Sequence, residues 1–253
     1  MGQILKYILK NGLRDKLYIG LFVVLAISFA VSIFLGSTMM VEQNISSVVF
    51  VLAISRTVVS VGMILFVCIN VSRAFDNKEI EFILSKSISR EQFILGYLGG
   101  FFLANLLILL PIFLVILIIY KINYLGLFFW FFTTLLENFI VIAFALLSSL
   151  ILKNSFSAIL SSFGFYAISR LMGMFVMTID FTDEIAMARH GNLGMALKIL
   201  SIMFPRLDLY SQSSWAVYGN WNNMILTIVF CQSLIYLPLL IFMSFHDFKK
   251  KQF

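Results

Sequence analysis

Charged residues are scarce in this chain, and their scarcity indicates a protein of the membrane. Asp, Glu, Lys and Arg make up 12% of the 253 residues, whereas 61% are hydrophobic. Several apolar runs exceed the roughly 20 residues that a helix needs to cross about 30 Å of hydrocarbon. The composition therefore predicts a polytopic membrane protein.

Groups that carry catalysis or bind metals are also few. The two cysteines, Cys68 and Cys231, lie in apolar runs and form no metal-binding or disulfide pattern. The two histidines, His190 and His246, fall in segments expected on opposite sides of the membrane, with no serine placed beside either. The chain has no Gly-x-x-x-x-Gly-Lys-Ser/Thr phosphate loop. We therefore expect a non-enzymatic chain without catalytic residues, metal ligands or a cofactor of its own.

The apolar runs define six spans, and each is expected to be a helix. Lipid offers no partner to backbone polar groups, and these runs are too long and too little alternating for barrel strands. The predicted fold is all-α, a single transmembrane domain over residues 1–253. Its spans cover residues 17–40, 48–71, 93–120, 124–152, 156–179 and 224–245.

The segment before the first span, residues 1–16, is amphipathic. We expect it to form a helix in the membrane interface, with its apolar face in the membrane and its basic face toward the headgroups. It could serve only as an anchor, or it could meet a cytosolic partner. The apolar face holds Ile4, Leu5, Ile8, Leu9 and Leu13, opposite Gln3, Lys6, Lys10 and Arg14.

The distribution of Lys and Arg predicts the orientation of the six spans. The side that holds both termini carries Lys6, Lys10, Arg14, Lys16, Arg73, Lys78, Lys86, Arg90, Lys153, Lys249, Lys250 and Lys251. The other side carries only Lys121, Arg189, Lys198 and Arg206. Because cytoplasmic loops carry the excess of Lys and Arg, both termini are expected in the cytoplasm. The net charge of +6 then reflects topology and contact with an anionic lipid bilayer, and we expect no nucleic acid partner.

Three ionisable residues, Arg56, Glu137 and Arg170, fall inside spans at overlapping depths. An uncompensated charge at the bilayer centre costs at least about 2.5 to 3.5 kcal/mol, so Glu137 should face the interior and pair with Arg170 or Arg56. One carboxylate cannot neutralise two arginines. Either one arginine meets an anionic substrate, or Arg56 extends its side chain to the outer interface.

Residues 72–92, SRAFDNKEIEFILSKSISREQ, form a charged segment between the second and third spans. Asp76 to Ser85 favours an amphipathic helix, with Ile80, Ile83 and Leu84 on one face. The opposite face, expected in solvent, holds Asp76, Lys78, Glu79, Glu81 and Lys86. Ser89 and Gln92 have the spacing of a capping box that would begin the third span. A turn between spans needs only a few residues, so this insertion indicates a docking surface.

The segment resembles the corresponding part of the ABC-2 permease family, the membrane subunits of ATP-binding-cassette exporters, and especially of its six-span, NosY-like members. The matching residues are Asp76, Glu81, Phe82, Ile83, Leu84, Ser85, Ile88, Ser89, Arg90, Phe93 and Gly96. The chain departs from the family at Lys78 and Glu79, where Gly-Thr is frequent, at Ser87, where Pro is frequent, and at Tyr97, where Lys is frequent.

The resemblance implies a function and a set of partners. Residues 72–92 would be the coupling region that docks on a cytosolic ATPase, through Asp76, Glu79, Glu81, Phe82, Ile83, Leu84, Ser85, Ser89 and Arg90. Two copies of that ATPase would bind ATP and Mg, and a second permease subunit, a homodimer partner, would complete the exporter. The location would be the bacterial cytoplasmic (inner) membrane. The exported substrate would be hydrophobic or amphipathic.

Residues 180–223 form a long outer segment before the last span. Its apolar stretch Gly191 to Phe204 would reach only about 21 Å as a helix, too short to cross, so it should lie on the outer surface or dip in and return. Trp215, Tyr218 and Trp221 are expected at the headgroup level, where amphipathic rings collect. By resemblance, short outer-leaflet helices here would gate the pathway, at Leu193, Leu197, Leu200 and Phe204.

Two functions of other classes stay open, a secondary transporter and a membrane scaffold for assembly of a larger complex. Secondary transporters usually show inverted repeats and Gly/Pro-broken helices at the midplane. This chain shows no internal repeat, and of its three prolines only Pro111 and Pro238 fall within spans. A scaffold would keep its function when ATP hydrolysis is blocked. ATP-coupled transport is therefore the function that the sequence favours.

Overall fold

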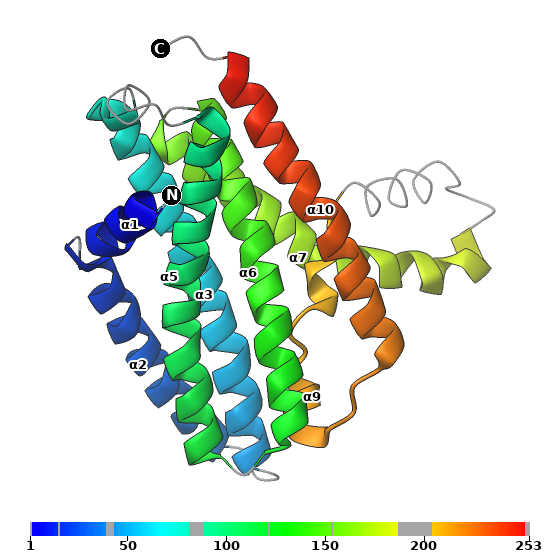
Figure 1. Ribbon diagram of the computed structural model, residues 1–253. Helices are drawn as coiled ribbons and strands as arrows, with labels where there is room; N and C mark the ends of the chain where they lie inside the picture. Colours follow the sequence, from blue (N-terminus) through cyan, green and yellow to red (C-terminus); the bar gives the residue numbers. More distant parts are fainter. Residues whose placement is uncertain are drawn as a thin grey trace.

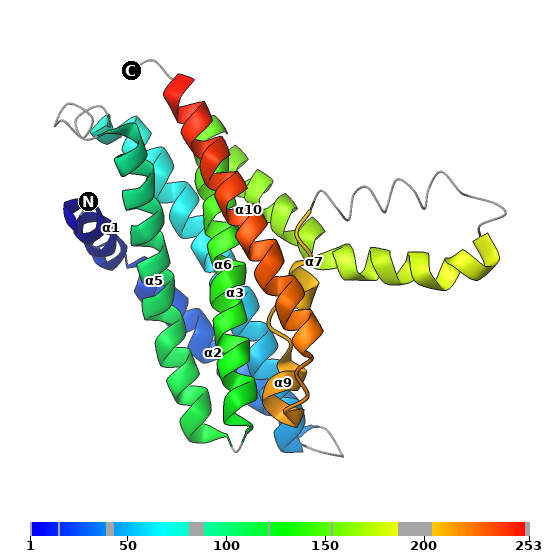
Figure 2. The ribbon, with the colours of Figure 1, turned by 45° about the vertical axis from the view of Figure 1, so that its right-hand side comes forward.

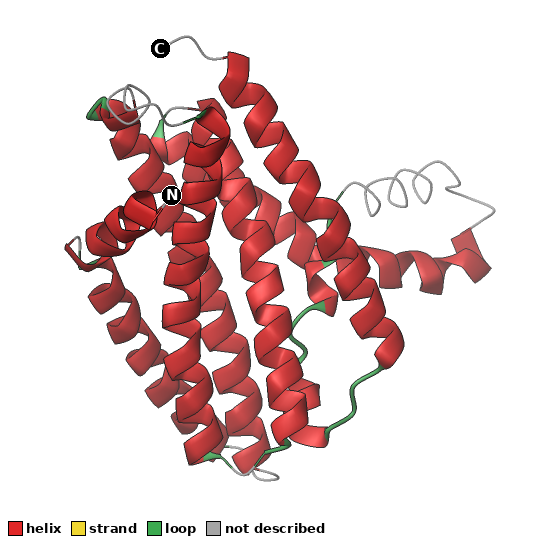
Figure 3. Ribbon diagram, in the orientation of Figure 1, coloured by secondary structure: helices red, strands yellow, loops and turns green. Residues whose placement is uncertain are grey.

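The chain is described by a computed structural model that covers residues 2–14, 16–38, 43–80, 89–120, 122–152, 154–186 and 204–250. All regular structure in these ranges is helical, and none of them contains a strand (Figure 3). The six long helices are α2 (Leu17–Ser37), α3 (Gln43–Asp76), α5 (Arg90–Ile119), α6 (Tyr124–Leu152), α7 (Ser155–Ala186) and α10 (Asn223–Lys250). Each is long and apolar enough to cross a membrane, which confirms the predicted all-α, multi-pass membrane protein.

Three short elements complete the described chain. They are α1 (Gly2–Arg14), a single 3₁₀ turn η1 (Leu207–Leu209) and α9 (Ser213–Tyr218). Figure 1 shows α6 near the middle of the bundle, with α2, α3 and α5 on one side and α10 on the other. Both termini lie toward one end of the bundle, which we call the termini end. The end of α2, the start of α3, the end of α5, the start of α6 and α9 lie at the opposite end.

Several helices run past the predicted spans. Helix α3 continues to Asp76, α7 to Ala186 and α10 to Lys250, because a helix keeps its internal hydrogen bonds after its side chains become polar. The helix predicted over Asp76 to Ser85 begins later than expected. Asp76 ends α3, a turn follows in which Lys78 adopts a left-handed φ of 55°, and Glu79 and Ile80 are helical again.

The central helix of the bundle is α6, which packs against α3, α5, α7, α9 and α10. A chain of buried hydrogen bonds joins it to two of these neighbours. Ser60 of α3 donates to the Asn138 carbonyl oxygen at 2.6 Å, and the Asn138 amide donates to Asn105 of α5 at 3.0 Å. Because lipid offers these groups no alternative partner, the bonds hold the three helices in register.

Helix α1 lies across α5 near the termini end (Figure 2). Ile8 on its predicted apolar face is 2% exposed and packs over Gly100, where a Cβ would lie 2.6 Å from the Ile8 Cδ1. At this point, therefore, the apolar face covers protein and not lipid, which corrects the expected contact. That α1 lies at the membrane interface stays a prediction.

Candidate functional site

A stretch of chain without α-helix, which we call non-helical although it includes the single 3₁₀ turn η1, lies inside the bundle. Residues 204–212 precede α9 and include Leu207, Tyr210 and Ser211, each 0% exposed. The 3₁₀ turn η1 packs on α7, and α9 packs on α6 and α3. Irregular backbone is tolerated at membrane depth only when protein or a water-filled cavity satisfies its polar groups. Side chains of the neighbouring helices must therefore form hydrogen bonds with the polar groups of this backbone.

The ring of Trp215 is also inside. Trp215 is 1% exposed, and a Cβ on Gly126 of α6 would lie 1.8 Å from the Trp215 carbonyl oxygen, so the glycine permits the close approach of α9. Trp215 therefore packs against protein on α9, and its position at the headgroup level stays a prediction. Tyr218 is 63% exposed, and Trp221 packs its ring 5.3 Å from that of Phe129.

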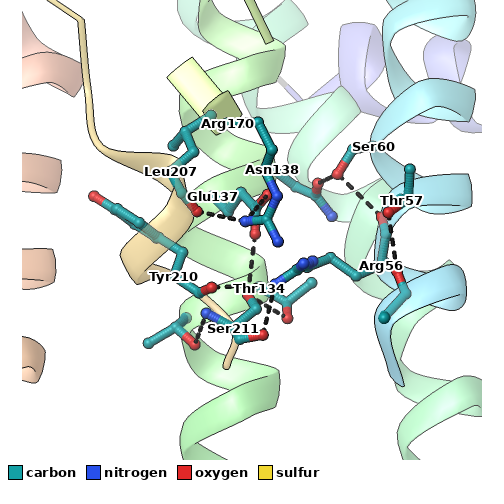
Figure 4. Close-up of polar contacts among 12 residues, drawn as sticks. Arg56, Thr57, Ser60, Thr134, Glu137, Asn138, Arg170, Leu207, Tyr210 and Ser211 are labelled. Carbon is teal, nitrogen blue, oxygen red and sulfur yellow. Dashed lines mark hydrogen bonds and ion pairs between the residues drawn. The ribbon is translucent and has the colours of Figure 1, made fainter. Parts of the chain in front are cut away.

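The three ionisable residues predicted within spans meet at this stretch (Figure 4). Arg56 Nη1 of α3 donates to the main-chain oxygens of Tyr210 at 3.1 Å and Ser211 at 2.5 Å. Arg170 Nη1 of α7 donates to the main-chain oxygen of Leu207 at 2.5 Å. The two arginines therefore bind carbonyl groups of the non-helical chain, a role that the sequence did not indicate.

The carboxylate of Glu137 lies between the arginines and is fully buried on α6. Its Oε1 is 3.6 Å from Arg170 Nη1, and its Oε2 accepts a hydrogen bond from Ser211 Oγ at 3.0 Å. Of the two pairings expected from the sequence, the ion pair with Arg170 is formed. Arg56 is 7% exposed and reaches the protein interior, so it does not extend to the outer interface.

Ser211 is the residue on which this network converges. Its amide donates to Thr133 Oγ1 at 3.2 Å, and its hydroxyl accepts from Thr134 Oγ1 at 2.8 Å while it donates to Glu137. Its φ of 53° is uncommon for a residue other than glycine and is held by these contacts. No local pattern in the sequence could have identified Ser211, because its partners on α6 are more than 70 residues away.

The buried polar cluster, defined here as Arg56, Thr133, Thr134, Glu137, Arg170, Tyr210 and Ser211, contains two positive charges and one negative charge. All members are buried except Arg170, whose side chain is 25% exposed. The surplus positive charge faces carbonyl dipoles, which offset part of the cost of its burial. Two atoms of the cluster, Arg56 Nε and Glu137 Oε1, lack a hydrogen bond within the described chain.

At the termini end, residues near the two ends of the charged segment 72–92 bond to α1 and α10. We call these contacts the junction. Tyr7 of α1 donates to Glu79 Oε2 at 2.5 Å, so Glu79 is bound to protein and not free in solvent as expected. Ser89 and Gln92 form the predicted capping box at the start of α5. Arg90 Nη1 donates to the main-chain oxygens of Phe248 at 3.1 Å and Lys249 at 2.8 Å, at the end of α10.

Ring packing adds to this junction, since Phe93 stacks on Phe248 with ring centroids 5.4 Å apart. The ion pair of Glu91 with Lys249, at 2.6 Å, joins side chains that are more than half exposed and contributes little. The segment that carries the family resemblance is therefore bonded at its two ends to α1 and α10.

Some of the predicted site residues cannot be placed. Those of the coupling region at Glu81, Phe82, Ile83, Leu84 and Ser85 lie outside the described residues, as do those of the outer gate at Leu193, Leu197 and Leu200. Phe204 of the outer gate is described and packs its ring 6.0 Å from that of Phe165 on α7. Asp76 is exposed at the end of α3.

In the described part of the chain, no three His, Cys, Asp or Glu side chains are grouped so that they could hold a metal ion. The chain matches no protein-family model, and no curated protein matches it. The evidence for the function therefore comes from two sites, the buried polar cluster and the junction at the termini end.

Proposed function

We propose that the chain is the permease subunit of an ABC-2 type exporter, which moves a hydrophobic or amphipathic substrate outward. A separate cytosolic ATPase, present in two copies, binds ATP and Mg and docks on residues 72–92. A second copy of the chain completes the pathway. The proposal starts from the resemblance of Asp76, residues 81–85, residues 88–90 and Gly96 to the family motif, and from six helices able to span a membrane.

The observation that carries the proposal is the bonding of both flanks of this segment to other helices. Toward its start, Glu79 accepts a hydrogen bond from Tyr7 of α1, and toward its end, Arg90 donates to the main-chain oxygens of Phe248 and Lys249 of α10. A loop that only connects two spans needs no such ties. If an ATPase displaces the segment, these bonds transmit the movement to α1, α5 and α10 together.

In this proposal, the buried polar cluster passes movement of the helices on to the outer end of the pathway. Helices α3, α6 and α7 each bind the non-helical residues 204–212 through Arg56, Glu137 and Arg170. A shift between these helices would move the chain that leads to Leu193, Leu197, Leu200 and Phe204. These residues are proposed to close the outer end of the pathway.

The test is purification of the tagged chain in mild detergent from its native membrane, with identification of the co-purifying chains by mass spectrometry. We expect an ATPase with the unaltered chain and its loss when Ile83→Asp and Leu84→Asp are combined. His246→Asp is the matched control, because this exposed residue near the termini end lies outside the segment. An unaltered preparation without any ATPase would refute the proposal.

A substitution at Arg90 tests whether the contact with α10 transmits the movement of the docked ATPase. Arg90→Met removes the two bonds to α10 but leaves residues 81–85 intact. Because Arg90 is also among the expected docking residues, both quantities are measured, and we expect the stimulation of ATP hydrolysis to fall severalfold more than the affinity for the ATPase. Full stimulation would mean that the contact with α10 does not transmit the movement.

A secondary transporter is a second candidate, which the buried polar cluster favours. Such transporters place substrate and ion sites where helices are interrupted within the membrane, and Glu137 is a fully buried carboxylate beside a non-helical stretch. This candidate predicts that no ATPase co-purifies and that Na⁺ or a change of pH shifts the melting temperature of the isolated chain. Glu137→Gln should abolish that shift, and a persistent shift would reject the carboxylate as its origin.

A further inference from the structure

A groove opens on the side of the bundle between α2, α3 and α5, away from both sites described above. Its volume is about 400 Å³. Gly20 and Val24 of α2, Val61 and Phe66 of α3 and Ile108 of α5 line it, and Lys16 lines one end. Apart from Lys16 and Thr57, the residues that line it carry no polar side chain, and none of these described residues is acidic.

The packing of α2 on α3 fixes the direction of the groove. The two helices run antiparallel, since Leu21 packs over Gly62 near one end and Gly36 over Ser47 near the other. Lys16, one turn before Gly20, therefore lies beside Phe66, at the end of the groove nearer the termini. The opposite end of the groove lies at Thr57.

The dimensions of the groove fit one hydrocarbon chain. From Phe66 to Thr57 the groove follows ten residues of α3, whose nine steps of 1.5 Å span about 14 Å. One leaflet supplies about half of a hydrocarbon core of roughly 30 Å. An empty groove of this kind loses dispersion contacts along its whole lining, and apolar walls do not hold water. Within the hydrocarbon region, the molecule available to fill the groove is the acyl chain of a lipid.

The residue at the end of the groove selects the headgroup. Lys16 is exposed at the elbow between α1 and α2, where its φ is 54°. Its ammonium group therefore stands where an apolar groove meets the surface of the bundle. A lysine near a membrane surface attracts anionic lipid by about 1 kcal/mol, and no carboxylate in the described lining competes for it.

We propose that the groove between α2 and α3 binds one anionic phospholipid of the bilayer. Its acyl chain lies along Gly20, Val24 and Val61, and its phosphate contacts the ammonium group of Lys16. The site requires only that the chain spans a membrane, so it stands whether or not the chain is an exporter.

Gly20 offers a direct way to fill the site. A Cβ at Gly20 would have no other atom within 4 Å, so Gly20→Leu adds an apolar side chain at the lining of the groove without overlap at its Cβ. Gly164 on α7 is a matched control, since it is also a helical glycine whose Cβ would meet nothing within 4 Å. Lys16→Asn removes the charge and keeps a residue that tolerates a left-handed φ.

The experiment is native mass spectrometry of the purified, delipidated chain, titrated with phosphatidylglycerol or with phosphatidylcholine of the same acyl chains. We expect one tightly bound phosphatidylglycerol and weaker phosphatidylcholine. Lys16→Asn should weaken phosphatidylglycerol about 5-fold and remove the preference. Gly20→Leu should abolish tight binding of both lipids, whereas Gly164→Leu should bind as the unaltered chain does.

Three results would overturn the proposal. They are equal binding of the two lipids by the unaltered chain, unchanged binding by Gly20→Leu, and a Gly20→Leu variant that loses self-association but keeps its lipid. The last result would assign the groove to a second copy of the chain. If Gly20→Leu does not fold, Val24→Trp fills the same groove, because the side chain of Val24 is already 48% exposed. Unchanged lipid binding by Val24→Trp would then overturn the proposal.

Discussion

The hydrogen bonds of Arg56 to the non-helical stretch give the most discriminating prediction for the described fold. Arg56→Met removes two bonds from a charged donor, to the main-chain oxygens of Tyr210 and Ser211. A hydrogen bond to a charged group contributes about 1.5 to 3 kcal/mol, so the two bonds contribute at least about 3 kcal/mol. We use this lower limit, because loss of the arginine also removes the cost of burying its charge.

This loss should appear locally, in residues 205–216. The amide of Tyr210 is bonded to the Leu207 carbonyl and the amide of Ser211 to Thr133, so both should be protected from hydrogen exchange. A loss of about 3 kcal/mol corresponds to exchange that is about 100-fold faster. Hydrogen exchange of the chain in lipid nanodiscs, followed by mass spectrometry, measures it.

The matched control is Arg90→Met, which also removes a guanidinium from two main-chain carbonyls, but at the end of α10. It should leave exchange at residues 205–216 unchanged. The reasoning is refuted if Arg56→Met folds and exchanges at the unaltered rate, or if it accelerates exchange equally in the core of α6. The latter would mean that Arg56 stabilises the whole bundle and not the stretch that it contacts.

Three further predictions concern packing and capping. Gly126→Ala should lower the melting temperature measured by fluorescence-detected gel filtration, because its Cβ would overlap main-chain atoms of Trp215, whereas Gly164→Ala should not; equal effects would contradict the close approach of α9. Asn138→Leu should cost about 1 to 2 kcal/mol, since interhelical bonds in membranes contribute about 0.6 kcal/mol each and two groups lose their partner; an unchanged melting temperature would contradict it. Ser89→Ala should cost about 1 kcal/mol and speed hydrogen exchange in the first turn of α5, where unchanged exchange at Gln92 would argue against the cap.

The local features of this chain could be predicted because their causes are local. The six spans follow from the length and composition of each apolar run, and the capping box follows from Ser89 and Gln92, three residues apart. The amphipathic α1 follows from its own periodicity. The later start of the helix predicted from Asp76 has a local cause as well. Composition locates where an apolar run ends, but it does not say whether the helix ends with it.

The buried polar cluster could not be predicted to the same extent. The cost of an ion in lipid indicated that Glu137 would be paired, and the sequence limited its partners to Arg56 and Arg170. Which arginine pairs with it depends on how α3, α6 and α7 are rotated. That both arginines also bind the carbonyls near Ser211 depends on where the chain returns into the bundle, more than 150 residues after Arg56.

The sequence by itself determined that this is an all-helical membrane protein with six spans, because satisfaction of the backbone in lipid leaves no other use for such apolar runs. Only the tertiary structure decided that residues 204–212 lie inside the bundle, that Trp215 is buried and that a groove ending at Lys16 runs between α2 and α3. Packing between helices selects these contacts, and in a membrane that packing depends on close fit between side chains far apart in the sequence.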